Sequence, residues 1–425
     1  MDERRLCSSS FDQLPKEVVL EILYRLPPIC AIRCKCVCRL WFSLISHASF
    51  SHQYLLRSNL SLVQENTFAL YIQRCSDPNN NFVLYHDQES WYNVNPSQFS
   101  LNFNLPPQSA GGSSVLFLEP SNGIVLHTTF SDCNGEYPYS AYSVLNPLTK
   151  QWLLLPPLPP DEHHTNALVG LVCDPRDHMT SRFKVVRIVF PGRIGQITRS
   201  LDVVIFDSET SHWSKSTVSC QHRVYFCTLD RSSAAMEYKG ILFWKILMDD
   251  VLFAYDPCNS HCQCSLIPLP EECDGGSPRN IDMRIGMSQG HIQIVQMEVS
   301  LCCYVWRLED HRAPEWCLEH KIFLNESVVK DSPFSASLPS LLALDPVDSN
   351  IVYFQRHTGM LTAFASFNLQ TRQMEVIHCF EDGSLFSYKA LAFVLPRWPT
   401  LLPKLLCTVV SSQSCATGKK NTIIK

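Results

Sequence analysis

Four residues near the middle of the chain are of the types that bind zinc. Cys258, His261, Cys262 and Cys264 lie close together in sequence, and thiolates and imidazoles are common zinc ligands. A strong zinc signal pairs two closely spaced ligands with a second such pair at ordinary distance, and no second pair faces this group. We therefore expect structural thiols here, and the sequence predicts no metal site.

Three further cysteines occur at every second position. Cys34, Cys36 and Cys38 fall in a stretch whose apolar spacing favours a helix. Side chains two residues apart on a helix point in different directions, so these thiols cannot converge on one ion without unwinding it. This group is also expected to bind no metal, and the sequence predicts no cofactor.

One cluster has the residue types of general acid–base catalysis. Asp161, Glu162, His163 and His164 directly follow a proline-rich segment, LLPPLPP. Neighbouring side chains on an irregular loop rarely form a catalytic dyad, so we expect a solvated loop. The chain has no G-x-S-x-G, H-E-x-x-H, phosphate-binding or dinucleotide-binding motif, and we expect it to be no enzyme.

Composition and charge limit the classes of partner. With 425 residues, of which 45% are hydrophobic and 18% charged, the chain is long enough for two or three domains with a substantial core. The net charge is −5, because residues 1–58 carry +3 (8 basic, 5 acidic) and the remainder carries −8 (27 basic, 35 acidic). A mildly basic head on an acidic body argues against nucleic acid as a partner, since that would require a basic face.

Cysteine usage indicates the compartment. The chain has 20 cysteines but opens MDERRLCSSS, without the apolar segment of a secretory signal. No uninterrupted apolar run is long enough to span a bilayer, so we expect no membrane partner. A reducing compartment, cytosol or nucleus, is therefore expected, with the cysteines acting mainly as small buried hydrophobes.

The stretch from Phe11 to Arg57 is predicted to form helices, because its apolar residues follow helical spacing. Val18, Ile22 and Leu26 recur at every fourth position, which places them on one face of a helix. Leu23 widens this apolar face. The same spacing predicts a third helix from Val37, Leu40, Trp41, Leu44 and Ile45. Three short helices bury too little surface to be stable alone, and an apolar face left over indicates a partner.

Prolines mark the boundaries of the first two helices. Pro15 suits a first helical position, where its missing N–H is no loss, and Glu17 lies in the first turn, where the helix dipole favours an anion. Pro27-Pro28 should end the first helix, because proline disfavours the α conformation of the preceding residue. A short second helix is expected from Ile29 to about Lys35.

This stretch resembles the F-box motif of plant F-box proteins. The landmarks occur in order: LP at 14–15, EIL at 21–23, RLP at 25–27, and R-x-K-x-V-C-R-x-W at 33–41, followed by LI at 44–45. The resemblance implies docking onto a Skp-type adaptor and, through it, onto cullin and RING subunits of a ubiquitin ligase. The residues it implies for this surface and its supporting core are Leu14, Pro15, Ile22, Leu23, Leu26, Pro27, Val37, Cys38, Trp41, Leu44 and Ile45. The other interpretation is a helical cap packed on the following domain.

The rest of the chain contains a repeat. Apolar runs end in an acidic or amide residue, and a large side chain opens the next run four to seven residues later. An Asn or Asp at the start of a tight turn accepts hydrogen bonds from the backbone ahead of it, and the following Trp can pack between neighbouring sheets. These anchor pairs are Asp87/Trp91, Asn146/Trp152, Asp207/Trp213, Asp256/Cys262, Glu309/Trp316 and Asn368/Met374. We interpret the Trp residues as scaffold.

Four short strands fit between successive anchors, which is typical of a β-propeller of about six or seven blades. Two units are the clearest: strands at 170–175, 183–190, 201–210 and 212–218, and strands at 341–346, 350–355, 361–371 and 373–380. The body also contains KVV at 184–186, FDSET at 206–210 followed by Trp213, GILFW at 240–244 and LPRWPTLLP at 395–403. In these motifs it resembles the F-box-associated, kelch-like propellers of plant F-box proteins, although Cys262 and Met374 replace the usual Trp. The expected organisation is a disordered leader at 1–10, the F-box at 11–57, the propeller at 60–403 and a disordered tail at 404–425.

The resemblances together imply the substrate-recognition subunit of a Skp–cullin–F-box ubiquitin ligase. The propeller would hold a target protein for ubiquitination, with loops on a rigid scaffold carrying the binding. Two alternatives remain open: a propeller enzyme with a helical leader, and an F-box scaffold that does not promote degradation. The sequence leaves the substrate unknown.

Overall fold

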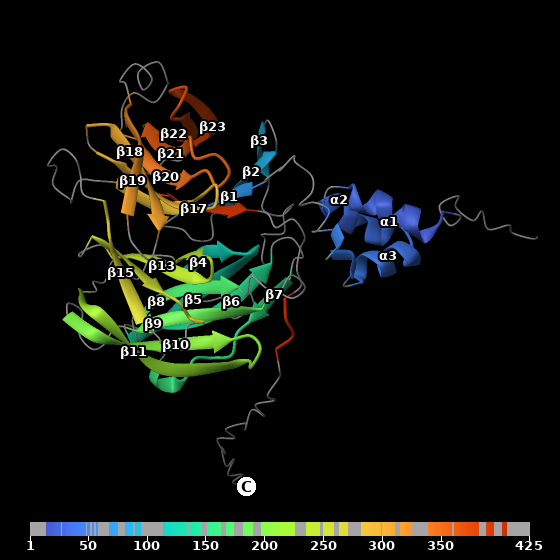
Figure 1. The fold of residues 1–425 in the computed structure, drawn as a ribbon, viewed down its shortest axis with the longest axis horizontal. Coiled ribbons are helices and arrows are strands. Elements are labelled where there is room, and N and C mark those ends of the chain that lie inside the picture. The colour runs from blue at the N-terminus through green and yellow to red at the C-terminus, as the bar shows by residue number, and fades with distance from the viewer. Residues whose placement is uncertain are drawn as a thin grey trace, which may run out of the picture.

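The computed structural model describes a helical module followed by a body of β-sheets (Figure 1). It describes residues 14–26, 28–47, 49–51, 53–54, 57, 68–74, 81–87, 90–94, 114–133, 136–146, 151–162, 167–173, 182–189, 197–225, 235–246, 250–258, 263–270, 282–298, 300–310, 315–324, 339–358, 361–381, 388–394 and 402–405. The predicted leader, and the tail beyond residue 405, lie outside this set. Among the described helices, none is long and apolar enough to cross a membrane.

The helical module consists of α1 (Lys16–Tyr24), α2 (Pro28–Arg33), the 3₁₀ turn η2 (Cys34–Cys36) and α3 (Arg39–Ser46). Pro15 lies just before α1, and its carbonyl accepts the N–H groups of Val18 and Val19. The expected first helical position is therefore wrong by one residue. Glu17 does lie in the first turn, and Pro28 opens the second helix instead of ending the first, as its fixed φ allows.

The core of this module uses a different face of α1 from the one that its spacing first suggests. Val19 and Leu23 are fully buried, whereas Val18 and Ile22 are exposed. Both pairs are spaced by four residues, so periodicity alone could not choose between them. The remaining buried apolar side chains of this core are Ala31, Trp41, Leu44, Ile45, Phe50 and Tyr54.

The body is built from antiparallel hairpins, and four of its described sheets have four strands each. The strands between residues 167 and 268 form one eight-stranded sheet, which divides into two antiparallel groups of four at a short parallel pairing of Ser219 and Cys220 with Gln263 and Cys264. The first two such groups are β4 (Ser114–Ser121), β5 (Ile124–Cys133), β6 (Glu136–Asn146) and β7 (Gln151–Leu154); then β8 (Ala167–Cys173), β9 (Phe183–Val189), β10 (Ile197–Asp207) and β11 (His212–Tyr225). The next two are β12 (Met236–Tyr238), β13 (Ile241–Ile246), β14 (Val251–Tyr255) and β15 (Gln263–Pro268); then β16 (Asp282–Ser288), β17 (His291–Met297), β18 (Cys302–Asp310) and β19 (Glu315–Phe323). A further group is β20 (Ser340–Leu344), β21 (Ile351–Thr358), β22 (Leu361–Asn368) and β23 (Gln373–Glu381).

The last group joins the two ends of the body. Its order is β24 (Tyr388–Val394), β1 (Phe68–Arg74), β2 (Asn81–Asp87) and β3 (Ser90–Val94), so the final strand pairs with the first one (Figure 1). We call the first-named strand of each group its leading strand: β4, β8, β12, β16, β20 and β24. The leading strands contact one another in that order, and β24 contacts β4 to close the ring. This closure makes the body propeller-like, as the repeat predicts.

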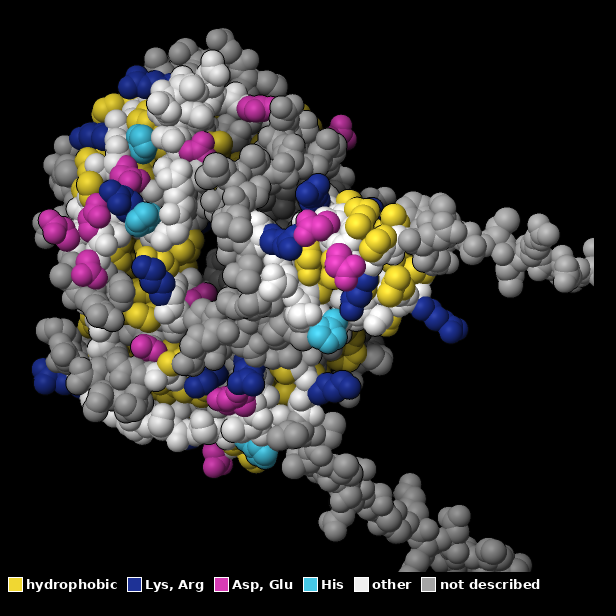
Figure 2. Space-filling view, turned by 45° about the vertical axis from the view of Figure 1, so that its right-hand side comes forward, with side chains coloured by type: hydrophobic (Ala, Val, Ile, Leu, Met, Phe, Trp, Pro, Cys, Tyr) yellow, Lys and Arg dark blue, Asp and Glu magenta, His cyan; other side chains and the backbone are white. Residues whose placement is uncertain are grey.

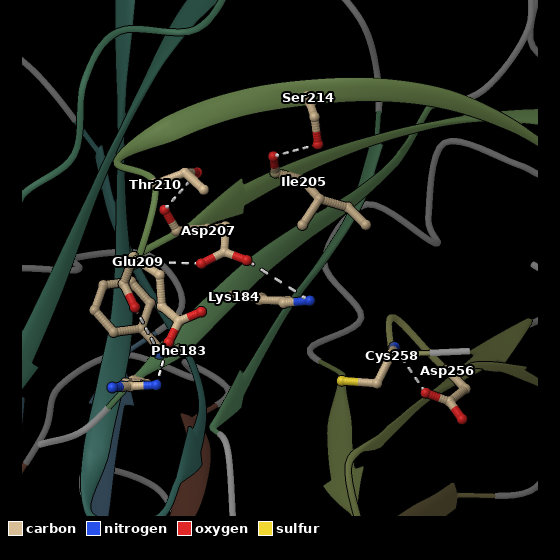
Figure 3. Close-up of polar contacts among 11 residues, drawn as sticks. Phe183, Lys184, Ile205, Asp207, Glu209, Thr210, Ser214, Asp256 and Cys258 are labelled. Atoms are coloured by element: carbon tan, nitrogen blue, oxygen red, sulfur yellow. Dashed lines mark hydrogen bonds and ion pairs between the residues drawn. The ribbon is translucent and has the colours of Figure 1, made fainter. Parts of the chain in front are cut away.

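The predicted repeat coincides with one hairpin of every group, the turn between its third and fourth strands. The Asp207 Oδ1 atom accepts the N–H of Glu209 at 2.8 Å, and the Asp256 Oδ1 atom accepts the N–H of Cys258 at 2.8 Å (Figure 3). The Asn368 Oδ1 atom accepts two such bonds, from Gln370 at 3.0 Å and Thr371 at 2.8 Å. The turn chemistry expected from these residue types is confirmed at these three positions.

The anchoring tryptophans behave differently from one another. The Nε1 atom of Trp213 donates to the carbonyl of Pro156 at 2.9 Å, and that of Trp316 donates to the carbonyl of Pro268 at 2.8 Å. Both bonds join one four-strand group to the group before it, which confirms the scaffold interpretation. Trp152 is 47% exposed, so the expectation is wrong there, because β7 is an edge strand whose outer face stays uncovered.

Candidate partner-binding surface

The residues expected to bind an adaptor separate into supporting core and outer surface. Leu23, Trp41, Leu44 and Ile45 are buried and hold the helices together. Leu14, Leu26 and Cys38 are partly buried against the same core. Pro15, Ile22 and Val37 are exposed, and Pro27 lies outside the described residues. The exposed group is the most accessible to another protein, and the partly buried group keeps some accessible surface.

The structure adds three exposed apolar residues that the expected set lacks. Val18 extends Ile22 along α1, and Leu40 and Phe42 follow Val37 at the start of α3. Val37 is 57% exposed and Phe42 is 56% exposed, which is unusual for large apolar side chains. Figure 2 shows hydrophobic side chains gathered on the helical module. A helical projection of α3 places Phe42 away from Trp41, Leu44 and Ile45, and this signal could have identified it.

Polar contacts fix the helices beneath this surface. Arg57 forms an ion pair with Glu21 and stacks over the ring of Tyr24, 4.5 Å from its centroid. The hydroxyl of Tyr54 donates to the carbonyl of Leu26 at 2.5 Å, and burial raises the pKa of Tyr54 to about 12. These bonds tie the segment after α3 back to α1, so the exposed apolar side chains project from an ordered support.

Three basic side chains of the helical module differ in exposure. Arg33 and Arg39 are exposed, whereas Lys35 is half-buried and burial lowers its pKa. Exposed charges of this kind are typical of a solvated helix face and act on association rates only when a partner carries the opposite charge.

The residues considered for metal binding or catalysis are not assembled into a site in the described parts of the chain. Cys258 is exposed and Cys264 is buried, while His261 and Cys262 lie outside the described residues. Cys34 and Cys38 are half-buried and Cys36 is exposed. Across the described ranges, no three His, Cys, Asp or Glu side chains come together in a way that could hold a metal ion.

The proline-rich loop differs from its expectation at one residue. Glu162 is buried, and its carboxylate pairs with the ammonium of Lys215 at 2.7 Å, so this part of the loop is not solvated. Lys215 also pairs with Asp202 at 3.0 Å, and hydrogen bonds to Glu162 and Asp202 raise the Lys215 pKa. The loop is thus fastened to β10 and β11. His163 and His164 lie outside the described residues.

A helical module with an exposed apolar surface, followed by a propeller-like body, defines the class of F-box proteins that carry a β-propeller. Residues 11–53 match the F-box domain, and residues 59–389 match the family described as "F-box protein At3g26010-like, beta-propeller". The chain belongs to this family of plant F-box proteins.

Individual relatives agree with the family match. The chain is similar to F-box protein At3g26010 of Arabidopsis thaliana, with 26% identity over 90% of this chain and 89% of the relative. It is also similar to the putative F-box/kelch-repeat protein At1g15680 of the same plant, with 24% identity over 90% of this chain and 88% of the relative. Among solved structures, a putative 6-phosphogluconolactonase from Bacteroides uniformis covers 77% of this chain and 100% of its own, but a TM-score of 0.38 at 10% identity supports no inference.

Proposed function

We propose that this chain is the substrate-recognition subunit of a Skp–cullin–F-box ubiquitin ligase. The observation that carries the proposal is the set of exposed apolar side chains on the helical module, outside its buried core: Val18, Ile22, Val37, Leu40 and Phe42. Apolar side chains of a helix commonly bind in a groove of a partner protein. A Skp-type adaptor is the partner that the F-box family implies.

We further propose that the propeller-like body has six blades and holds a target protein. The six groups of four strands, and the closed order of their leading strands, support this count. Loops between the strands of a rigid scaffold are the usual carriers of binding. The target is unknown, and the chain would act by bringing it near the ubiquitin-charged enzyme, which raises effective concentration.

The cysteine content supports a cytosolic or nuclear location for this activity. The described residues include twelve free cysteines, several of them buried among apolar side chains. Free buried thiols are usual in reducing compartments. The cullin and RING subunits that the proposal requires would be bound through the adaptor.

The test is capture of a Skp-type adaptor by the purified full chain. The paired substitution Val18→Asp with Ile22→Asp places two charges on the exposed face of α1 and should weaken capture at least tenfold. Both positions are exposed, so the fold should persist, which a thermal unfolding curve would check. Undiminished capture by this variant would contradict the proposal.

The matched control is Phe323→Asp, at an exposed apolar residue on the outer strand β19 of the body. We expect this variant to capture the adaptor as well as the unmodified chain does.

Substrate abundance after proteasome inhibition would then separate a degradative role from a scaffolding one, because only a degradation target should accumulate.

A further inference from the structure

The body contains a cavity of about 350 Å³ at the place where the leading strands meet. Its walls come from β4, β12, β16, β20 and β24, so residues far apart in the sequence face one another across it. The short side chains of Ala343, Ala390 and Ala392 lie on the wall and leave room between the strands. The volume is within the range of about 300 to 1,000 Å³ that is typical of small-molecule sites.

One acidic side chain, Glu237 of β12, lies on this largely apolar wall. Its Oε1 atom accepts the N–H of Gly240 at 2.7 Å, and its Oε2 atom accepts the hydroxyl of Ser121 at 3.2 Å. These bonds come from a turn of its own hairpin and from β4 of another sheet, so the carboxyl group is held in a fixed place. An ionised carboxylate can accept about four hydrogen bonds, and further donors could therefore reach it from the cavity.

The charge of Glu237 is not balanced by a neighbouring base, in contrast to other acids in the described regions. Glu162 pairs with Lys215, and Glu319 pairs with Arg307 at 2.6 Å. Arg284, which also lines the cavity, pairs with Asp282 at 2.9 Å, so its charge is already offset. Among the described residues, no Lys, Arg or His forms an ion pair with Glu237.

A carboxylate in an apolar environment is stabilised by a cation, because low local polarity strengthens the attraction and removes competing water. Burial disfavours the charged form of Glu237 and so raises the pKa of its carboxyl group, and a cation beside it would favour the ionised form. The cavity therefore combines an anionic hydrogen-bond acceptor with apolar walls. This combination suits a ligand that has a positively charged nitrogen at one end and a hydrocarbon body.

We propose that the central cavity binds an organic cation, an ammonium or guanidinium group on a short apolar body, through the carboxylate of Glu237. The charged group would occupy the free acceptor positions of Glu237, and the hydrocarbon would pack against Leu342, Ala390 and Ala392. The cation could be a free amine or the side chain of a lysine or arginine on a bound protein. This proposal does not rest on the adaptor proposal, since no residue of the helical module takes part.

Calorimetric titration of the full chain with n-hexylamine tests the proposal. We expect hexylammonium to bind at least tenfold more tightly than n-hexanol, which has the same body without the charge. Hexanoate should bind more weakly than either, because it would place a second anion beside Glu237. Equal binding of hexanol and hexylamine, preferential binding of hexanoate, or no binding of the amine would overturn the proposal.

Glu237→Gln is the critical variant because it keeps the shape of the side chain and removes its charge; its amide oxygen can still accept the N–H of Gly240, and its amide N–H can donate to the hydroxyl oxygen of Ser121. It should lower hexylamine affinity at least tenfold and leave hexanol affinity unchanged. The matched control, Glu375→Gln, changes an exposed acid on β23 and should bind hexylamine like the unmodified chain. If Glu237→Gln alters only the unfolding temperature and not amine binding, Glu237 is a structural acceptor and the proposal is wrong.

A cavity-filling variant and two blocked amino acids complete the experiment. Ala392→Leu adds hydrocarbon to the wall and should reduce binding of both hexylamine and hexanol, with an unfolding curve showing that the body remains folded. Nα-acetyl-lysine amide and Nα-acetyl-arginine amide then distinguish the sources of the cation. Binding at least as tight as that of hexylamine identifies a protein side chain as the occupant, and binding of hexylamine alone identifies a free amine.

Discussion

At the scale of single residues, His127 gives the clearest link between burial and stability. It lies on β5 with 1% of its surface exposed, and burial lowers its pKa to about 4. An unfolded chain holds histidine near its ordinary pKa of about 6.5, so below that pH the unfolded state binds the proton more readily than the folded state does. Acid should therefore favour unfolding, and the stability is lost as the pH falls from about 6.5 towards about 4.

We expect His127 to cost the folded state about 2 to 3 kcal/mol between neutral pH and pH 4.5. Replacing it by leucine removes the titrating group, so the free energy of unfolding of His127→Leu should fall less steeply over this interval. Urea denaturation at several pH values measures the slope. His291→Leu, at an exposed histidine, is the control and should keep the slope of the unmodified chain; an unchanged slope for His127→Leu would contradict the prediction.

At the scale of elements, the pairing of β24 with β1 determines whether the body closes. The register runs from Phe68 opposite Val394 to Arg74 opposite Tyr388, and it joins segments more than 300 residues apart. Loss of β24 would leave the backbone groups of β1 without their partners and would open the contacts of β24 with β4 and β20.

A chain that ends before Tyr388 should therefore unfold at a markedly lower temperature and with less cooperativity than the full chain. Differential scanning calorimetry measures both quantities. A chain that ends after residue 405 keeps β24 and the residues around Leu402, whose N–H donates to Gln151 at 3.2 Å. This second chain should unfold like the full one, and equal destabilisation of both would count against the closure argument.

At the scale of the whole molecule, the helical module and the body have separate hydrophobic cores. Among the described residues, the buried cluster of the module draws only on positions from Leu14 to Tyr54, and the clusters of the body draw on positions from Phe68 onward. Separate cores favour separate folding units, since each buries its own apolar surface.

Removing residues 1–57 should therefore leave the main unfolding transition of the body within about 3 °C of its value in the full chain. The isolated segment 1–57 should show no sharp transition until a partner covers its apolar side, because so short a chain buries little surface. Calorimetry of the two pieces checks both statements. A large loss of stability in the shortened chain would show that the helices serve as a cap on the body.

Much of the local structure could be predicted from the residues because short-range chemistry decides it. Asp207, Asp256 and Asn368 form the expected turns, since an Asx side chain reaches the N–H groups just ahead of it whatever surrounds the turn. The strands of the two clearest units agree with their expected ranges to within a few residues at most ends, although β11 extends to Tyr225. Of the F-box landmarks, EIL at 21–23 falls on α1, and Trp41 and LI at 44–45 fall on α3.

The tertiary structure alone decided which of these residues face outward and which strands meet. Val18 and Val19 have the same chemistry and neighbouring positions, yet only Val19 is covered, because the rest of the helical core lies on its side of α1. The partner of β1 comes from the far end of the chain, and Glu237 faces a cavity built by five leading strands. Such facts depend on contacts between distant segments, which local propensity and periodicity do not encode.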